Sequence, residues 1–319
     1  MTEEPGEWTD VTGEWEALAP AMAGSGPYHT AWWGRAVASV FGGEFRVWRH
    51  RDLHVPILSG GRLAARGFAS GHVGYGGVLA PDRRVPLAQQ LTVVTRLARH
   101  LALPCERLVT TPDPAARAGA EPGADTPGLT ERATCLITLP ADETALWAGY
   151  RAGDVRTEVR RAGQGGVTAR LLGSDEDLAP LLDLVHRAQR RVGAAYRTPP
   201  ELIAAIRRRD DESWFGVVAE NDGGPVAFGF FLVSAGSCVY LVSGWDGITP
   251  NAGALVVHTG LTEAIRRGCR TVDLGYSHQA SLMRFKRKFG AELRPYSTWA
   301  DAGSQETDQE YERDNVAHQ

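Results

Sequence analysis

The chain contains two lysines, Lys286 and Lys288, which stand two residues apart in one segment. Every other basic side chain among the 34 Lys and Arg residues is an arginine. A lysine ammonium is a compact, mobile charge whose pKa shifts on burial, whereas a guanidinium is a rigid fork that stays charged. A site that must stabilise developing negative charge on an oxygen would therefore suit a lysine. The alternative is that both lysines are solvated charges on an exposed helix face, and composition alone favours that interpretation.

The surrounding segment predicts how these lysines would be positioned. Residues 271–275 (TVDLG) are predicted to form a short buried strand that ends in a turn at Gly275. Three apolar residues follow at spacings of three and four, on one face of a helix: Leu282, Phe285 and Phe289. Gly290 suits the position after the last helical turn. We therefore expect a strand, a tight turn and a helix that carries both lysines.

An arginine-rich segment, residues 155–162 (VRTEVRRA), is a second candidate for chemistry. It predicts a helix in which Arg156 and Arg160 share one face, because they are four residues apart, with Arg161 next to them. Such a stripe of guanidinium groups suits phosphate binding. The alternative is a solvated helix in a chain that uses arginine throughout.

Further polar and aromatic residues stand where side chains of a site often gather. Arg197 follows Tyr196 at a predicted helix entrance, where it would bind a carboxylate or phosphate with two parallel hydrogen bonds, or else form a structural ion pair. Asp273 lies on the strand before the turn, where it would orient the first lysine or accept a proton, or else be purely structural. Trp245 ends a predicted strand and Tyr276 flanks the turn. We take all five as candidates for substrate binding.

The order of predicted elements indicates the fold class. In each half, helices precede a meander of three strands, and a helix and a further strand follow; the meanders lie within residues 45–68 and 215–245. This pattern predicts an α+β fold with a mixed, mostly antiparallel sheet flanked by helices in each half. We expect an acidic N-terminal segment (1–24), a first domain (25–140), a second domain that carries the site (141–300), and an acidic tail (301–319) whose composition predicts disorder.

Charge is distributed unevenly along the chain. The net charge is −4, which argues against a general nucleic-acid binder. Residues 1–16 carry six acids and no Lys or Arg, and residues 301–319 carry six acids and one Arg. The intervening part then has 33 basic and 26 acidic side chains, so a basic patch on it is expected.

Other classes of protein are excluded by simple patterns. The four cysteines are scattered, with neither a CxxC pair nor a His at zinc-ligand spacing, so no metal site is expected. No apolar run is long enough to span a bilayer, and the acidic N-terminus lacks the pattern of a secretory signal. The sequence therefore predicts a cytoplasmic protein with reduced thiols.

Three strings, in this order and spacing, resemble the Fem-type (FemABX-like) aminoacyl-tRNA-dependent transferases. Residues 74–81 (GYGGVLAP) are similar to the Tyr-Gly-Gly loop of the first domain of that family. Residues 155–167 (VRTEVRRAGQGGV) are similar to its Arg-rich stretch, and residues 284–290 (RFKRKFG) to its Phe-Lys-x-x-aromatic-Gly string. The resemblance covers about residues 25–300.

The resemblance implies two acetyltransferase-like (GNAT) domains and an aminoacyl-tRNA as co-substrate, with no cofactor. The implied reaction moves the amino acid to the amine of a small peptide or metabolite, and forms an amide bond in specialised-metabolite (antibiotic) or cell-wall precursor biosynthesis. It further implies that Lys286 lies at the reacting centre beside Phe285, and that Arg197 and Tyr240 hold the acceptor. On this view the arginine stripe and Lys288 contact tRNA phosphates.

Two departures from the family leave alternatives open. No long periodic segment corresponds to the helical arm of relatives that build peptidoglycan bridges, which favours a small acceptor. Residues 246–254 (DGITPNAGA) lack the Gln or Arg lead of a coenzyme A pyrophosphate loop. An acyl-CoA-dependent N-acyltransferase with a degenerate loop is the second hypothesis, and a non-catalytic tRNA- or peptide-binding module is the third.

Overall fold

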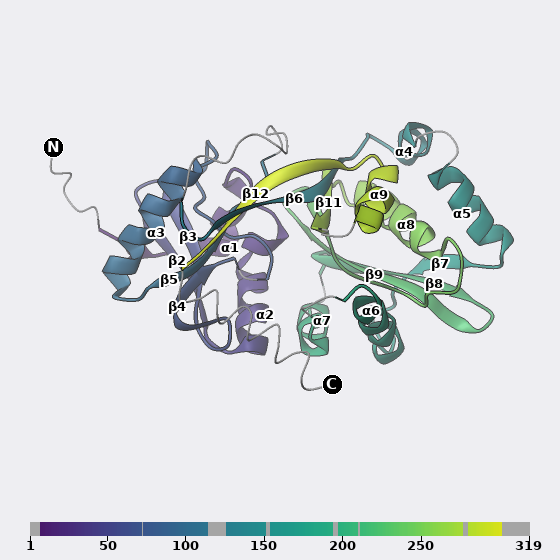
Figure 1. Ribbon diagram of the computed structural model, residues 1–319, viewed down its shortest axis with the longest axis horizontal. Coiled ribbons are helices and arrows are strands. Elements are labelled where there is room, and N and C mark those ends of the chain that lie inside the picture. Colours follow the sequence, from purple (N-terminus) through teal and green to yellow (C-terminus); the bar gives the residue numbers. More distant parts are fainter. Residues whose placement is uncertain are drawn as a thin grey trace. The chain divides into compact units, whose positions relative to one another are not determined.

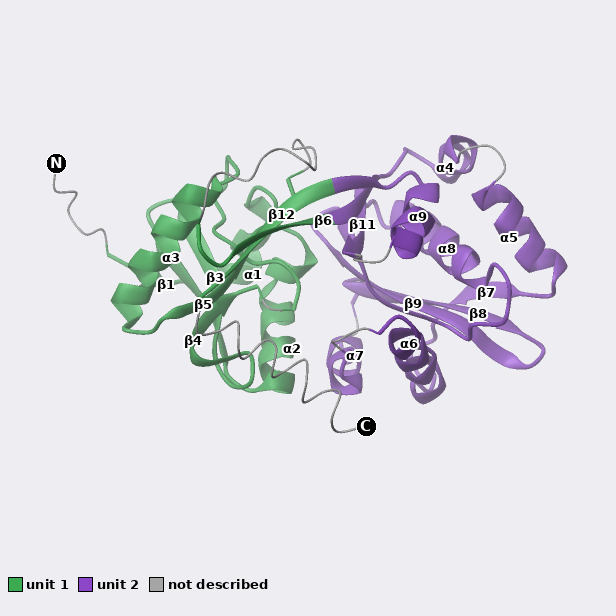
Figure 2. Cartoon of the chain, in the orientation of Figure 1, with its two compact units in different colours: residues 1–133, 294–311 green, residues 134–293, 312–319 purple. Residues whose placement is uncertain are grey.

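The computed structural model describes residues 7–71, 73–113, 126–150, 154–193, 197–209, 211–276 and 280–301 (Figure 1). Tyr196 and the tail after Asp301 lie outside these residues. The chain forms two compact units, residues 1–133 with 294–311 and residues 134–293 with 312–319 (Figure 2). The chain passes from unit 1 to unit 2 near residue 133 and returns to unit 1 near residue 294. The predicted division into consecutive segments did not include this return.

Unit 1 is a six-strand arrangement in the order β1-β2-β3-β4-β5-β12, in which the β4–β5 pair is parallel. The pairs β1–β2, β2–β3, β3–β4 and β5–β12 are antiparallel. Its elements are β1 (Thr9–Asp10), α1 (Trp15–Leu18), the 3-10 turns η1 (Ala19–Ala21) and η2 (Pro27–His29), α2 (Ala31–Phe41), β2 (Glu44–His50), β3 (Leu53–Gly60), β4 (Ala64–Ser70), α3 (Leu87–Leu101), β5 (Cys105–Val109) and β12 (Glu292–Ala300).

The acidic N-terminal segment is part of the core of unit 1. Its apolar residues Val11 and Trp15 are buried, and Trp15 donates its indole N–H to the carbonyl of His29 over 2.5 Å. The neighbouring acids Asp10 and Glu14 remain at the surface, where Asp10 lies 3.6 Å from the guanidinium of Arg46. A high density of acids therefore does not prevent this segment from folding, because its apolar side chains are spaced so that they can be buried in unit 1.

Unit 2 carries the strands in the order β6-β11-β10-β9-β8-β7, in which only the β10–β11 pair is parallel. Its elements are β6 (Leu129–Thr138), α4 (Glu143–Gly149), α5 (Val155–Gln164), β7 (Thr168–Leu171), α6 (Ala179–Arg191), α7 (Pro200–Arg207), β8 (Trp214–Asn221), β9 (Gly224–Ser234), β10 (Ser237–Trp245), α8 (Ala252–Arg266), β11 (Thr271–Tyr276) and α9 (Ala280–Lys288). The predicted α+β class, with mixed and mostly antiparallel pairing flanked by helices, is confirmed.

Helices cover both faces of the unit 2 strands, with α6 and α7 on one side and α8 and α9 on the other (Figure 1). Two glycines allow this close packing. A Cβ on Gly260 of α8 would lie 2.2 Å from the ring of Phe231, and a Cβ on Gly244 of β10 would lie 2.4 Å from the main chain of Leu184 in α6. The main chain of α6 therefore rests directly on β10, the strand that borders the candidate site.

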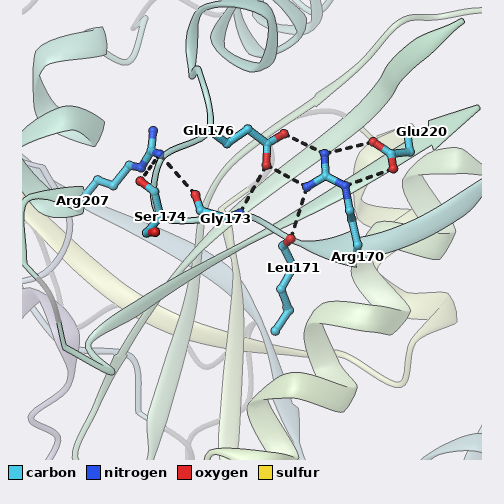
Figure 3. Close-up of polar contacts among 7 residues, drawn as sticks. All are labelled: Arg170, Leu171, Gly173, Ser174, Glu176, Arg207 and Glu220. Carbon is cyan, nitrogen blue, oxygen red and sulfur yellow. Dashed lines mark hydrogen bonds and ion pairs between the residues drawn. The ribbon is translucent and has the colours of Figure 1, made fainter.

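The start of α6 differs from the sequence-based expectation. The apolar spacing of Leu178, Leu181 and Val185, with Ser174 before two acids, favours a helix from residue 175 capped by Ser174. Instead, α6 begins at Ala179 with Pro180 in its first turn and without a side-chain cap from Ser174. Figure 3 shows what holds the preceding segment: the carbonyl of Ser174 accepts a hydrogen bond from Arg207, and Arg170 bridges Glu176 and Glu220. These partners favour the non-helical path, so the prediction of a Ser174 cap was wrong.

No helix in the described ranges is both long enough and apolar enough to cross a bilayer.

The packing of α6 on β10 predicts a large effect of one methyl group. Gly244→Ala should destabilise the protein by about 1–3 kcal/mol, because the added Cβ overlaps the α6 main chain. Gly163→Ala in α5 is the matched control, since nothing lies within 4 Å of its added Cβ, and it should stabilise by about 0.5–1 kcal/mol. Urea denaturation midpoints measure both changes, and an unchanged midpoint for Gly244→Ala would contradict the packing described.

Candidate active site

The parallel strands β10 and β11 are paired over a short stretch only. Their register joins Ser237–Val239 to Thr271–Asp273. Beyond Val239, the pairing of β10 with β9 shifts register between Tyr240 and Val242. Beyond this point, the main-chain groups of β10 and β11 no longer pair regularly with each other. Side chains of α9, the helix that follows β11, can therefore approach them.

Helix α9 places Lys286 at the end of β11. The Lys286 ammonium donates hydrogen bonds to the carbonyl of Gly275 over 2.9 Å and to the carbonyl of Tyr276 over 3.0 Å. The described residues provide the ammonium with these two hydrogen bonds only, so the third of its N–H groups has no partner among them. A half-buried ammonium with one available donor is suited to bind an oxygen that gains negative charge.

Burial shifts the pKa of this group. Removal of water lowers the pKa of the Lys286 ammonium from its ordinary value, and the nearby Cys135 and Asp273 oppose the shift. Lys286 in turn acts on Cys135: burial raises the pKa of that thiol, and the ammonium partly offsets the rise. Carbonyl groups rather than an ion pair therefore hold the Lys286 charge in place.

The buried carboxylate of Asp273 holds the irregular stretch of β11 that Lys286 contacts. One of its oxygens, Oδ1, accepts hydrogen bonds from the hydroxyl of Thr134 over 2.5 Å and from the main-chain N–H of Gly275 over 2.7 Å. Gly275 has a φ of 79°, a conformation that favours glycine. Asp273 thus binds the N–H of the residue whose carbonyl, in the next peptide unit, accepts from Lys286. Thr134 belongs to the site although its sequence context gave no signal, because only the register of β6 against β11 places it there.

Two aromatic candidates lie at the same place. The main-chain carbonyl of Tyr240 is 4.0 Å from a Cβ built on Gly275, and its ring stacks on Phe231 with 4.7 Å between centroids. Burial raises the pKa of the Tyr240 hydroxyl, so this group is a neutral donor. The ring of Phe285 reaches to 4.0 Å from a Cβ built on Gly253, near the start of α8. The structure therefore gathers Lys286, Asp273 and the exposed Tyr276 around Gly275, with the carbonyl of Tyr240 nearby, whereas the ring of Phe285 approaches α8.

Trp245 lies at the other end of β10. The guanidinium of Arg191 is 5.4 Å from the Trp245 ring centroid and donates to the Trp245 carbonyl, which ties the end of α6 to the β10–α8 loop. Arg197 stands before α7 and makes no ion pair with the described residues. The geometry described does not join these two residues to Lys286, and their roles in substrate binding stay predictions.

The predicted arginine stripe lies on α5, and an ion pair links this helix to α9. Lys288 of α9 lies 2.6 Å from the carboxylate of Glu158 in α5. We define the α5/α9 basic face by the exposed or half-exposed arginines of these two helices: Arg156, Arg160, Arg161, Arg284 and Arg287. Within the described residues none of the five has an ion-pair partner, and only Arg160 has a ring contact, at 5.6 Å from the centroid of Trp147. In contrast, Arg170, Arg266 and Arg267 of the same unit are each bound by carboxylates.

A search of the described residues for groups of three or more His, Cys, Asp or Glu side chains able to hold a metal ion finds none.

The presence of only two lysines allows a direct test of the Lys286 environment. With lysine labelled with carbon-13 at Cε, a Lys288→Arg variant retains one lysine signal, and its pH titration by NMR should give a pKa below the ordinary value of about 10.4. The unfolded state then binds more protons between the two pKa values, so stability should rise with pH across that interval and should not do so in Lys286→Met. A titration at or above the ordinary value would contradict the buried position.

Comparison with known proteins places this geometry in a known fold. Residues 150–287 match the family model described as acetyltransferase (GNAT) domain. The structure of FemX is similar over 96% of this chain and 100% of that chain, with 12% identity and a TM-score of 0.65. A conserved protein of unknown function from Bacteroides thetaiotaomicron is similar over 93% and 100% of the two chains, with 11% identity and a TM-score of 0.61.

A third structure, a tandem GNAT protein from the clavulanic acid biosynthesis pathway solved without AcCoA, covers 92% of this chain and 98% of its own, with 13% identity and a TM-score of 0.50. The search of curated proteins finds no match. The domain match supports acyltransferase activity, and the structural similarity over nearly the whole chain extends the fold to both units. The chain therefore has the Fem-like fold of two acetyltransferase-like units in tandem.

Proposed function

We propose that this protein is an aminoacyltransferase that moves an amino acid from an aminoacyl-tRNA to the amine of a small peptide or metabolite. The proposal is carried by the Lys286 ammonium, which two carbonyls hold at the point where β10 and β11 cease to pair, and whose third N–H has no partner among the described residues. The product is an amide, of the kind used in specialised-metabolite or cell-wall precursor biosynthesis. The expected setting is the cytoplasm, where charged tRNA is available.

The reaction needs little beyond positioning and charge. The acceptor amine attacks the ester carbonyl of the aminoacyl-tRNA, a C–N bond forms and negative charge develops on the carbonyl oxygen. The ester C–O bond then breaks, the ribose oxygen leaves, and the proton lost by the amine neutralises it. The unused N–H of Lys286 would donate to the developing oxyanion or to the leaving oxygen. Because the ester is already activated, no covalent intermediate on the protein is required.

The β10–α8 loop favours tRNA over coenzyme A as the donor. The Asp246 carboxylate accepts hydrogen bonds from the main-chain N–H groups of Ile248 and Thr249, over 3.0 and 2.9 Å, and from the Thr249 hydroxyl. The loop thus uses these amides to bind its own acid, and that negative charge would repel a pyrophosphate. This geometry supports aminoacyl-tRNA as the co-substrate and weighs against the acyl-CoA-dependent alternative.

The α5/α9 basic face supplies a surface for the phosphates of the donor. Lys286 and two of the face's arginines lie on the same short helix, so a nucleic acid bound along the face would lie close to the candidate reacting centre. Exposed guanidinium groups without carboxylate partners are available for phosphates. Lys288 would join them by exchanging its contact with Glu158 for a phosphate.

Replacement of Lys286 tests the catalytic role. Lys286→Met should lower the single-turnover rate of amide formation by roughly 100- to 1,000-fold, the effect of removing one oxyanion donor, while its unfolding midpoint stays close to that of the parent. Lys288→Met is the matched control: it should weaken donor binding and leave the rate at saturating donor nearly unchanged.

Rapid-quench assays with a charged tRNA and an excess of acceptor amine measure both rates. A folded Lys286→Met variant that transfers at the parent rate would remove Lys286 from the mechanism. A parent protein that binds charged tRNA but transfers to no amine would favour the non-catalytic binding module.

A further inference from the structure

The acidic tail has a regular charge pattern that the proposed function does not use. Between residues 302 and 319, the acids occupy every second position: Glu306, Asp308, Glu310, Glu312 and Asp314. Arg313 is the one Lys or Arg in the same stretch. In an extended chain, side chains two residues apart lie on one side at intervals of roughly 7 Å. When extended, the tail would therefore present a row of negative charges along one side. The phosphates of a nucleic-acid backbone present a similar row of negative charges to arginine side chains.

The α5/α9 basic face is complementary to this line. Its five arginines lie on two helices, and the described residues provide none of them with an ion-pair partner. Glu158, which lies between Arg156 and Arg160 on α5, is occupied by Lys288 over 2.6 Å and so does not neutralise them. A surface of this kind binds polyanions without regard to their chemistry, because the attraction is electrostatic.

The N-terminal acids are a less suitable occupant of the face. Thr9 and Asp10 pair with β2, and Val11 and Trp15 are buried in unit 1. Asp10 also accepts hydrogen bonds from the main chain and hydroxyl of Thr12. That segment is therefore fixed by its own contacts, whereas Asp301 is followed by 18 residues that span up to roughly 60 Å when extended.

We propose that residues 302–319 bind the α5/α9 basic face when no RNA is present and compete with tRNA for it. The proposal rests on the proposed function in one respect, the assignment of this face to tRNA phosphates. A tethered segment reaches an effective concentration in the millimolar range, so even weak binding of the tail lowers the apparent affinity for RNA. The tail would thereby exclude polyanions that bind more weakly than the donor.

The test removes the negative charges of residues 302–319 by substitution in the 319-residue chain. The variant with Glu306→Gln, Asp308→Asn, Glu310→Gln, Glu312→Gln and Asp314→Asn should bind total tRNA roughly three- to tenfold more tightly than the parent at low salt. The difference should shrink as salt rises, because both contacts are electrostatic. The double variant Glu14→Gln, Glu16→Gln is the control for loss of acidic charge outside the tail, since these exposed acids belong to the segment held by the buried Val11 and Trp15, and its affinity should equal that of the parent.

A second measurement does not involve RNA. A fluorescent peptide of residues 302–319 should bind the tail-neutral chain by anisotropy, and the additional changes Arg160→Ala and Arg161→Ala should remove that binding. Peptide binding without any tRNA binding would support the tail contact and overturn the proposed function. Equal tRNA affinities of parent and tail-neutral chains, with no peptide binding, would overturn the tail contact and leave the proposed function standing. A difference in tRNA affinity that grows with protein concentration would mean that a second copy supplies the tail, and would overturn binding within one chain.

Discussion

A half-buried ammonium held by two main-chain carbonyls is the interaction on which the rest of the site depends. Lys286 donates to the carbonyls of Gly275 and Tyr276 at the end of β11, where Gly275 has a positive φ and the pairing with β6 shifts register. This irregular stretch is held by the Asp273 carboxylate, which accepts hydrogen bonds from the Gly275 N–H and the Thr134 hydroxyl. Burial raises the free energy of the charged form of Lys286. A charged group in such an environment is a candidate for function rather than for stability.

The fold supplies the conditions for that interaction at each level. Close packing of α6 on Gly244 and of α8 on Phe231 through Gly260 fixes β10 and β9 between helices. Pairing of β10 with β11 stops after Val239 and Asp273, and α9 follows β11 closely enough to place its lysine there. The β10–α8 loop, which would bind pyrophosphate in a coenzyme A-dependent enzyme, is instead closed on the Asp246 carboxylate. Under the proposed function, this scaffold presents Lys286 to the developing oxyanion, while the amides of its β10–α8 loop bind the loop's own carboxylate.

Local sequence patterns predicted the parts of this account that depend on neighbours in the chain. The strand and the helix with Phe285 and Lys286 on successive positions follow from apolar spacing, and the Fem-like tandem fold follows from motifs in order. The predicted turn at Gly275 was wrong, because β11 continues to Tyr276 and Gly275 is an irregular position within it. What the sequence did not predict depends on partners far along the chain. Thr134 meets Asp273 only through the register of two strands, and the start of α6 is decided by Arg207 binding the Ser174 carbonyl. The roles of Arg197 and Trp245 stay predictions for the same reason, since the geometry of the substrate would decide them.

Under the proposed function, the donor is an aminoacyl-tRNA and coenzyme A is not used. The most direct measurement is retention of mixed, radiolabelled aminoacyl-tRNAs on the purified protein at rising salt, beside a calorimetric titration with acetyl-CoA. The account predicts retention of charged tRNA that weakens steeply with salt, a retained amino acid that identifies the donor, and no heat with acetyl-CoA. Binding of acetyl-CoA without retention of any aminoacyl-tRNA would contradict it and would establish the acyl-CoA-dependent alternative.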